Sequence, residues 1–94
     1  MSEESTNPLN TNFEMAINIV NNLKKRPSDN ELLEVYKFFK QAKFGDNNTP
    51  APGMLSFAKS AKWSAWKSVN GMSQDEAMQN YIDLAMKLFN VYGK

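Results

Sequence analysis

Three short motifs in the sequence have the form of a helix N-terminal capping box, in which Ser or Thr is followed three residues later by Glu. They are Thr11-Asn12-Phe13-Glu14, Ser28-Asp29-Asn30-Glu31 and Ser73-Gln74-Asp75-Glu76. In such a box the hydroxyl accepts a backbone N–H of the first helical turn, and the carboxylate accepts the N–H of the capping residue. Apolar residues follow at the spacing of one helix face, as in Phe13, Ala16, Ile17 and Val20. Nothing alternates with the period of two that a strand requires, so the pattern predicts helices.

Pro and Gly residues separate the helical segments and set their expected boundaries. The predicted helices cover about residues 11–26, 28–44, 59–69 and 73–92, with a long loop at 46–53. Residues 1–10 are polar and are expected to form a flexible N-terminal tail, while residues 11–94 form one domain. Four helices with one long connection predict an all-α bundle, and the three capping signatures agree with it.

The composition argues against most enzyme classes and against nucleic-acid binding. The chain has 94 residues and contains neither His nor Cys. It therefore lacks the commonest general base, a thiolate nucleophile and the commonest metal ligands. Its 11 basic and 10 acidic residues give a net charge of +1, which creates no general field for nucleic acid. We expect a protein that is not an enzyme, holds no metal and binds no nucleic acid.

The polar N-terminus has no apolar run of the kind found in a secretory signal. No window approaches the ~20 apolar residues of a membrane span. We therefore expect a cytoplasmic location, and nothing in the sequence indicates an obligate dimer, so a monomer is expected.

The second predicted helix has two different faces. At about 100° per residue, one arc of roughly 120° is apolar and suits the core. This arc comprises Leu32, Val35, Phe38, Phe39 and Ala42. A neighbouring stripe comprises Leu33, Tyr36, Lys40 and Lys43. The stripe passes from an apolar end through a phenol to ammonium groups, and a matching ligand would have an apolar, a flat and an anionic part.

The same stripe has a second interpretation. Tyr and Lys often line the rim of a core with their polar tips in water. The alternative applies equally to Lys62, Trp63 and Trp66, where the two indoles at i and i+3 would be core aromatics and the lysine simply solvated.

Several motifs follow one another in a fixed order along the chain. They are Tyr36-x-x-Phe39-Lys40-Gln41-Ala42, Gly45-Asp46, Pro52-Gly53-Met54-Leu55, Ala61-Lys62-Trp63-x-Ala65-Trp66, Gly71-Met72-Ser73 and Tyr81-Ile82. In these motifs the chain resembles the acyl-CoA-binding protein family, of the small single-domain cytosolic type, over about residues 12–93. The pairing of KQA-x-x-GD with AKW-x-AW at this separation is highly specific.

The resemblance implies an antiparallel four-helix bundle in up-down-down-up order. It implies non-enzymatic binding, buffering and intracellular transport of long-chain acyl-CoA esters, with no cofactor and no catalytic residue. Transient contacts with membranes or with acyl-CoA-using enzymes fit such a carrier.

The resemblance also implies a site for the nucleotide head group of the ligand. Tyr36, Lys40, Lys62 and Tyr81 match the family's head-group positions. The two lysines would hold the ribose 3′-phosphate and neighbouring phosphates, and the two tyrosines would help to enclose the nucleotide. Phe39 stands where the family often has tyrosine, and would keep a ring to face the adenine.

Further residues complete the expected site. Lys37 and Phe38 lie in the same binding segment, although the helical phase of Phe38 points toward the core. Leu32 and Leu33 match positions that meet the acyl chain.

Two positions depart from the family pattern and remove positive charge. Asn21 and Ala58 each replace a lysine that is often present, and Lys59 lies next to Ala58. A helical protein–protein adaptor that keeps the bundle but has weakened or lost ligand binding is therefore the alternative function.

Overall fold

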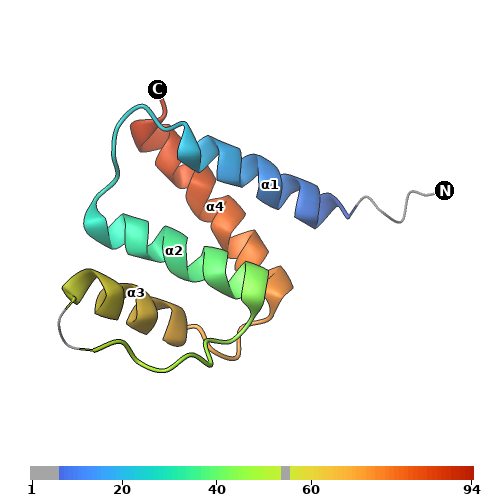
Figure 1. Ribbon diagram of the computed structural model, residues 1–94. Helices are drawn as coiled ribbons and strands as arrows, with labels where there is room; N and C mark the ends of the chain where they lie inside the picture. The colour runs from blue at the N-terminus through green and yellow to red at the C-terminus, as the bar shows by residue number, and fades with distance from the viewer. Residues whose placement is uncertain (1–6, 54–55) are drawn as a thin grey trace.

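The structure is a computed structural model of the chain and describes residues 7–53 and 56–94. These residues form four α-helices and no strand. The helices are α1 (Pro8–Asn21), α2 (Asp29–Phe44), α3 (Phe57–Lys67) and α4 (Gln74–Tyr92) (Figure 1). The all-α class predicted from the sequence is confirmed. Residues 1–6 of the expected tail and Met54-Leu55 of the expected motif lie outside the described residues.

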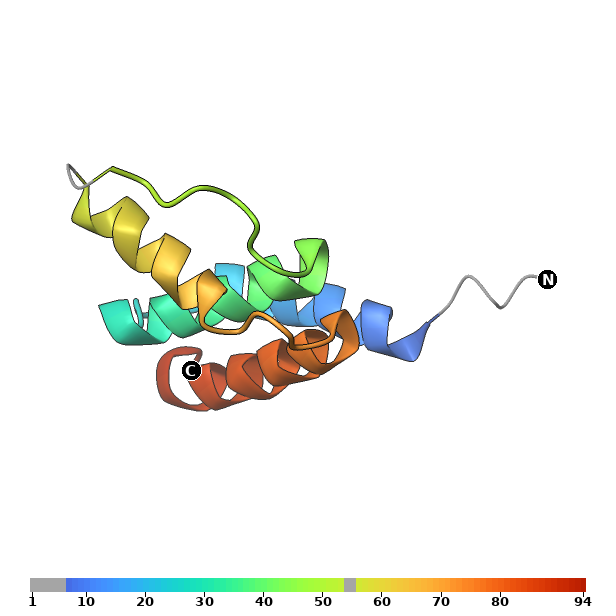
Figure 2. The same ribbon diagram turned by 90° about the horizontal axis from the view of Figure 1, so that it is seen from below.

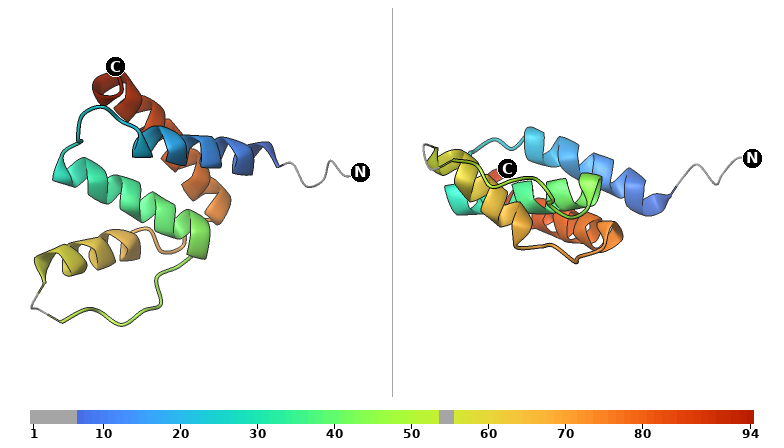
Figure 3. Two further views of the ribbon diagram at one scale, coloured as in Figure 1. Left: turned by 45° about the horizontal axis from the view of Figure 1, so that its top comes forward. Right: turned by 60° about the horizontal axis from the view of Figure 1, so that its bottom comes forward.

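Helices α1 and α4 run in one direction and α2 and α3 in the other, which confirms the up-down-down-up order (Figure 1). Helix α4 packs against both α1 and α2, whereas in the described part of the chain α3 packs against α2 alone. Figure 2, seen from below, shows α2 between α3 and α4. The left view of Figure 3 shows α3 and the long connection before it on the side of α2 that faces away from α1 and α4. Helix α3 is therefore an outer wall of the bundle.

Helix α1 begins one turn earlier than the sequence pattern predicted. The start at Thr11 is wrong, because the N-cap is Asn7, whose side chain accepts the N–H of Leu9 at 2.9 Å. Pro8 occupies the first turn, where its missing N–H removes no hydrogen bond and its fixed φ suits the helix. Pro8 to Asn10, which the sequence assigned to the tail, are therefore helical.

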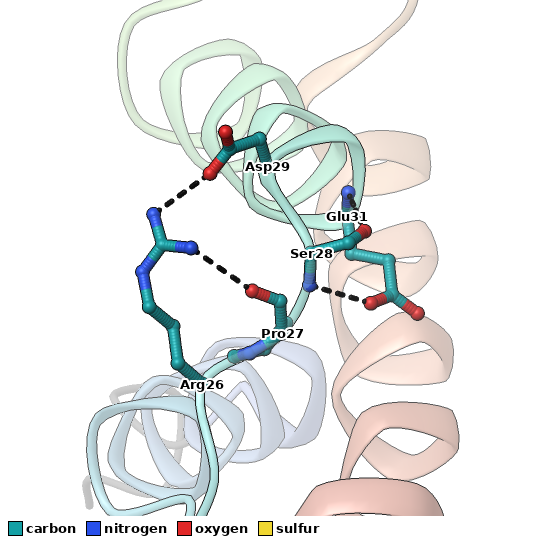
Figure 4. A network of polar contacts seen from close by, with 5 residues as sticks. All are labelled: Arg26, Pro27, Ser28, Asp29 and Glu31. Atoms are coloured by element: carbon teal, nitrogen blue, oxygen red, sulfur yellow. Dashed lines mark hydrogen bonds and ion pairs between the residues drawn. The ribbon is translucent and has the colours of Figure 1, made fainter.

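The capping box of α2 is complete, as predicted. Ser28 Oγ accepts the N–H of Glu31 at 3.1 Å, and Glu31 Oε1 accepts the N–H of Ser28 at 2.9 Å (Figure 4). The helix ends at Phe44 because Gly45 has φ of 77°, a left-handed conformation that favours glycine. At α4, Ser73 Oγ accepts the N–H of Glu76 at 3.0 Å.

Helix α3 lies two residues earlier than predicted at both ends. Its N-cap is Ser56, whose hydroxyl accepts the N–H of Lys59 at 3.2 Å, so the helix begins at Phe57. After Lys67 the backbone hydrogen bonds connect residues three apart instead of four, as from the N–H of Asn70 to the carbonyl of Lys67, and the α-helix ends.

The core lies between α1, α2 and α4 and is built largely from alanine and aromatic residues. Its buried members are Phe13, Ala16, Ala42, Ala77, Tyr81 and Ala85. Alanine leaves room for helix axes to approach closely, and the rings of Phe13 and Tyr81 fill the space edge to face with centroids 5.1 Å apart. This packing joins α1, α2 and α4 in one core.

Asn47 ties the connection between α2 and α3 to the outer wall. It is fully buried. Its N–H donates to Asn70 Oδ1 at 2.8 Å, and its Nδ2 donates to the carbonyl of Trp63 at 3.1 Å. Its own carbonyl accepts Lys67 Nζ at 3.2 Å. A buried polar side chain with this many partners holds the loop in one conformation.

The residues of the Gly-Asp and Trp motifs add to this attachment. Trp66 Nε1 donates to the carbonyl of Gly45 at 2.8 Å. The carboxylate of Asp46 accepts the N–H of Gly71 at 2.8 Å and Gln41 Nε2 at 2.9 Å. These two hydrogen bonds, that of Gly71 first, lower the pKa of Asp46. The motif residues therefore position α3 against α2.

The end of α4 fastens the connection between α1 and α2. The carbonyl of Tyr92 accepts the N–H groups of Lys24 and Lys25, each at 3.0 Å. The hydroxyl of Tyr92 donates to Glu31 Oε1 at 2.6 Å.

Among the described residues, no helix is long and apolar enough to cross a membrane.

Candidate functional site

A partly open cavity of about 770 Å³ lies among the four helices, and we call it the main cavity. Most of its lining is apolar. Ile17, Val20, Leu32, Leu33, Val35, Phe39, Phe57, Ala58 and Ala61 form this part. The polar or charged lining residues are Asn21, Arg26, Asp29, Tyr36, Lys62 and Tyr81. A cavity of this size and character lies within the range of small-molecule sites.

The cationic side of the main cavity is centred on Tyr36. Lys62 reaches from α3 to lie with its Nζ 5.5 Å from the centre of the Tyr36 ring. Lys40, one turn after Tyr36 on α2, has its Nζ 5.9 Å from the same centre, although it is not among the residues that line the cavity. The structure thus brings together two lysines from different helices around one phenol ring. Two ammonium groups, each within about 6 Å of the centre of one ring, form a favourable place for a multiply charged anion.

Tyr81 reaches the main cavity from the core. Its side chain is only 3 % exposed, and its ring packs against Phe13 and, at 6.3 Å between centroids, against Phe39. Burial raises the pKa of Tyr81 to about 12, which is even further above neutral pH than the ordinary value for tyrosine. A protonated phenol at the cavity can donate a hydrogen bond to an anionic ligand.

A second hollow of about 220 Å³ adjoins the main cavity. Its lining residues are Tyr36, Thr49, Pro52, Lys59, Lys62, Trp63 and Trp66. Tyr36 and Lys62 line both spaces, so a ligand that occupied both would lie against these two side chains. Trp63 is held by its Nε1, which donates to the carbonyl of Thr49 at 3.1 Å.

Some residues of the predicted site line the main cavity, and others do not. Leu32 and Leu33, expected to meet an acyl chain, both line the main cavity. Lys37 does not line either space, because its Nζ pairs with Glu34 at 2.8 Å. Phe38 packs against the core cluster, as its helical phase predicted.

The side chain of Lys43 does not join Tyr36 and Lys40, with which the sequence analysis grouped it. Its Nζ lies 3.5 Å from the carboxylate of Glu14 on α1, not beside Tyr36. The helical phase of Lys43 is close to that of Tyr36, but seven residues separate them along α2, and α1 supplies a carboxylate within reach of the lysine.

The two departures from the family pattern both lie at the main cavity. Asn21 on α1 and Ala58 on α3 line it, whereas Lys59 lines the second hollow instead. Sequence reasoning missed a cation that the structure places at the main cavity, Arg26. Its Nη2 lies 2.9 Å from Asp29 Oδ1, and its Nη1 donates to the carbonyl of Pro27 at 3.4 Å (Figure 4).

Sequence reasoning also missed Phe57 and several apolar lining residues. Phe57 is 94 % exposed although it lines an apolar cavity. Phe57 directly follows the Ser56 cap, and this position on the first turn of α3 was the sequence signal that could have indicated an exposed ring there. Ile17 and Val20 follow the helical period of the core, and the sequence pattern does not distinguish a core face from a cavity wall. In the described part of the chain, no group of His, Cys, Asp and Glu side chains is arranged to hold a metal ion.

The fold and the cavity define a small helical ligand-binding domain. The model of the family described as acyl-CoA-binding protein matches residues 10–85. Acyl-CoA-binding domain-containing protein 6 of Arabidopsis thaliana is 46 % identical over 83 residues, which cover 88 % of this chain and 90 % of that protein. Acyl-CoA-binding protein homolog 1 of Caenorhabditis elegans is 43 % identical over 81 residues, covering 86 % and 94 %.

The crystal structure of acyl-CoA-binding protein 2 of Oryza sativa has the same fold, with a TM-score of 0.84 at 34 % identity. It covers 88 % of this chain and 92 % of that one. The chain therefore belongs to the acyl-CoA-binding protein family.

Proposed function

We propose that this protein binds long-chain acyl-CoA esters without covalent chemistry, buffers them and carries them through the cytosol as a monomer. The observation that carries the proposal is the main cavity, which joins a long apolar wall to a cationic, ring-lined side in a member of this family. An acyl-CoA has the matching division into an alkyl chain and a phosphate-rich nucleotide.

The head group is assigned to the side of the cavity that Tyr36, Lys62 and Tyr81 line, with Lys40 beside Tyr36. Lysine ammonium groups bind phosphate as compact point charges. Stacking of a base on an aromatic ring contributes about 1–3 kcal/mol in proteins that bind nucleic acids. Tyr36 and Phe39, which both line the cavity, offer such rings.

The acyl chain is assigned to the apolar lining that includes Leu32, Leu33, Val20 and Ala61. Transfer of each CH₂ from water contributes about 0.8 kcal/mol, so a 16-carbon chain contributes on the order of 10 kcal/mol at most. Ordering of the ligand offsets much of this figure. The chain should therefore set affinity and length preference, while the lysines and rings favour the CoA ester over free fatty acid.

The protein is proposed to act as a carrier and not as an enzyme, with no cofactor and no nucleic-acid partner. Membership in a family of binding proteins supports this. Transient contacts with membranes or with acyl-CoA-using enzymes would load and unload it.

Calorimetry with palmitoyl-CoA, free CoA and palmitate in one buffer tests the proposal. The carrier is expected to bind the ester more tightly than either part by orders of magnitude. The adaptor alternative rests on Asn21 and Ala58, which line the main cavity without charge. It predicts no heat from any of the three ligands, and that result would refute the carrier function.

A further inference from the structure

The ammonium group of Lys40 lies among three aromatic rings. Its Nζ is 4.5 Å from the centre of the Phe44 ring, 4.8 Å from that of Trp66 and 5.9 Å from that of Tyr36. A cation within about 6 Å of a ring centre is attracted by the negative face of the ring. Within residues 7–53 and 56–94, Lys40 forms no ion pair with a carboxylate. The rings are therefore the neighbours that attract this ammonium group.

Phe44 is the ring nearest to Lys40, and packing in the core does not explain it. It is the last residue of α2 and is 64 % exposed. An exposed ring gains little from the hydrophobic effect. Its place four residues after Lys40 puts the two side chains on the same side of the helix, where they can touch.

The position of the Phe44 ring is supported by a fixed neighbour. The ring centroids of Phe44 and Trp66 are 6.3 Å apart. Trp66 is buried and its Nε1 is bonded to the carbonyl of Gly45, so its ring has little freedom. Phe44 and Trp66 thus enclose the Lys40 ammonium from α2 and α3.

We propose that Phe44 is a positioning residue for ligand binding, whose ring holds Lys40 ready to meet a phosphate group of acyl-CoA. The inference rests on the proposed function, which assigns Lys40 to the phosphates. A free lysine side chain loses much rotational freedom when it binds a ligand, and restraining it beforehand reduces that loss. The ammonium has three N–H donors, so it can face the rings and still bind an anion.

A double-mutant cycle measured by calorimetry with palmitoyl-CoA tests this role. Phe44→Leu is expected to weaken binding by about two- to fivefold, the range of an exposed cation–π contact. In a Lys40→Met background the same change should have no further effect, because the group it positions is gone. Phe44→Tyr keeps a ring and should restore wild-type affinity. Phe89→Leu is the matched control, since Phe89 is a partly exposed ring on α4 that lines neither space, and it should bind as wild type.

The possible failures are distinguishable. A wild-type protein that binds no palmitoyl-CoA refutes the proposed function and this inference with it. If the wild type binds, two results overturn this inference alone. One is a Phe44→Leu variant whose affinity equals or exceeds that of the wild type. The other is an equal loss of affinity from Phe44→Leu in the wild-type and Lys40→Met backgrounds. Proton NMR of the ligand-free wild type gives a test without mutation. The ε-methylene protons of Lys40 should be shifted upfield of those of Lys94 by the rings, and coincident shifts would overturn the proposal.

Discussion

Replacement of Lys62 by alanine removes the cation that lines both the main cavity and the second hollow. The side chain is exposed and reaches toward the ring of Tyr36 from α3, and it lies outside the buried core. The substitution should therefore change ligand affinity with little change in the free energy of unfolding. Alanine also suits a helix interior, so α3 should remain intact.

The size of the effect follows from Coulomb's law. Two unit charges about 4 Å apart interact by about 1 kcal/mol in bulk water and by about 4 kcal/mol at the effective dielectric of a protein surface. Because Lys62 is exposed, solvent screens it, and a loss of about 1–2 kcal/mol is expected. This corresponds to a Kd for palmitoyl-CoA about five- to thirtyfold higher.

Calorimetry with palmitoyl-CoA at roughly 20 mM and 200 mM salt measures both the loss and its origin. The screening length falls by about threefold between these concentrations, so the difference between wild type and Lys62→Ala should shrink at the higher one. Lys87→Ala on α4 is the matched control, because it removes the same charge from an exposed lysine that lines neither space. Unchanged affinity of Lys62→Ala at low salt, or an equal loss in Lys87→Ala, would refute the head-group assignment.

Four further predictions concern stability and the Tyr36 ring. Ser28→Ala should lower the free energy of unfolding in urea by about 1 kcal/mol, because it removes the cap on the Glu31 N–H; an unchanged value would contradict this. Burial raises the pKa of Tyr81 from 10.0 to about 12, so its contribution to stability is complete below pH 10.0 and is lost as pH rises toward 12. Denaturation of Tyr81→Phe across that range should show a smaller loss than wild type, and parallel curves would argue against it. The hydrogen bond from Tyr92 lowers the pKa of Glu31, so this contribution is present above pH 4.5 and is lost as pH falls. Acid denaturation of Tyr92→Phe should therefore show a shallower dependence on pH below 4.5, whereas an unaltered dependence would count against the pairing. Tyr36→Phe should weaken palmitoyl-CoA binding less than Lys62→Ala in calorimetry, since it keeps the ring; a larger loss would assign the main role to the hydroxyl.

The helix boundaries that were predicted correctly depend on neighbours along the chain. The box at Ser28 and the stop at Gly45 are formed by residues within one turn of each other, so their signal is entirely local. The start of α1 was misplaced because Asn7-Pro8 and Thr11 are both plausible caps one turn apart. The local energies of such caps differ by only a fraction of their total of about 1 kcal/mol.

The site was only partly predictable for a different reason. Helical phase states the direction in which a side chain leaves its helix, but not which neighbour it meets. Lys43 illustrates this, since its phase is close to that of Tyr36 while its contact is Glu14 on α1. Arg26 reaches the main cavity because the end of α4 fastens the connection that carries it, a contact that no pattern around position 26 indicates.

Periodicity and capping thus predicted which segments are helices, and the ordered motifs indicated the family. The cavity itself lies among the four helices, and its walls combine side chains as distant in the sequence as Ile17 and Tyr81. Hydrogen bonds and apolar spacing within a helix connect residues three or four positions apart, so the local sequence is enough to predict them. Which lysines lie beside which rings depends on how the packed core and the Asn47 contacts set α3 against α2.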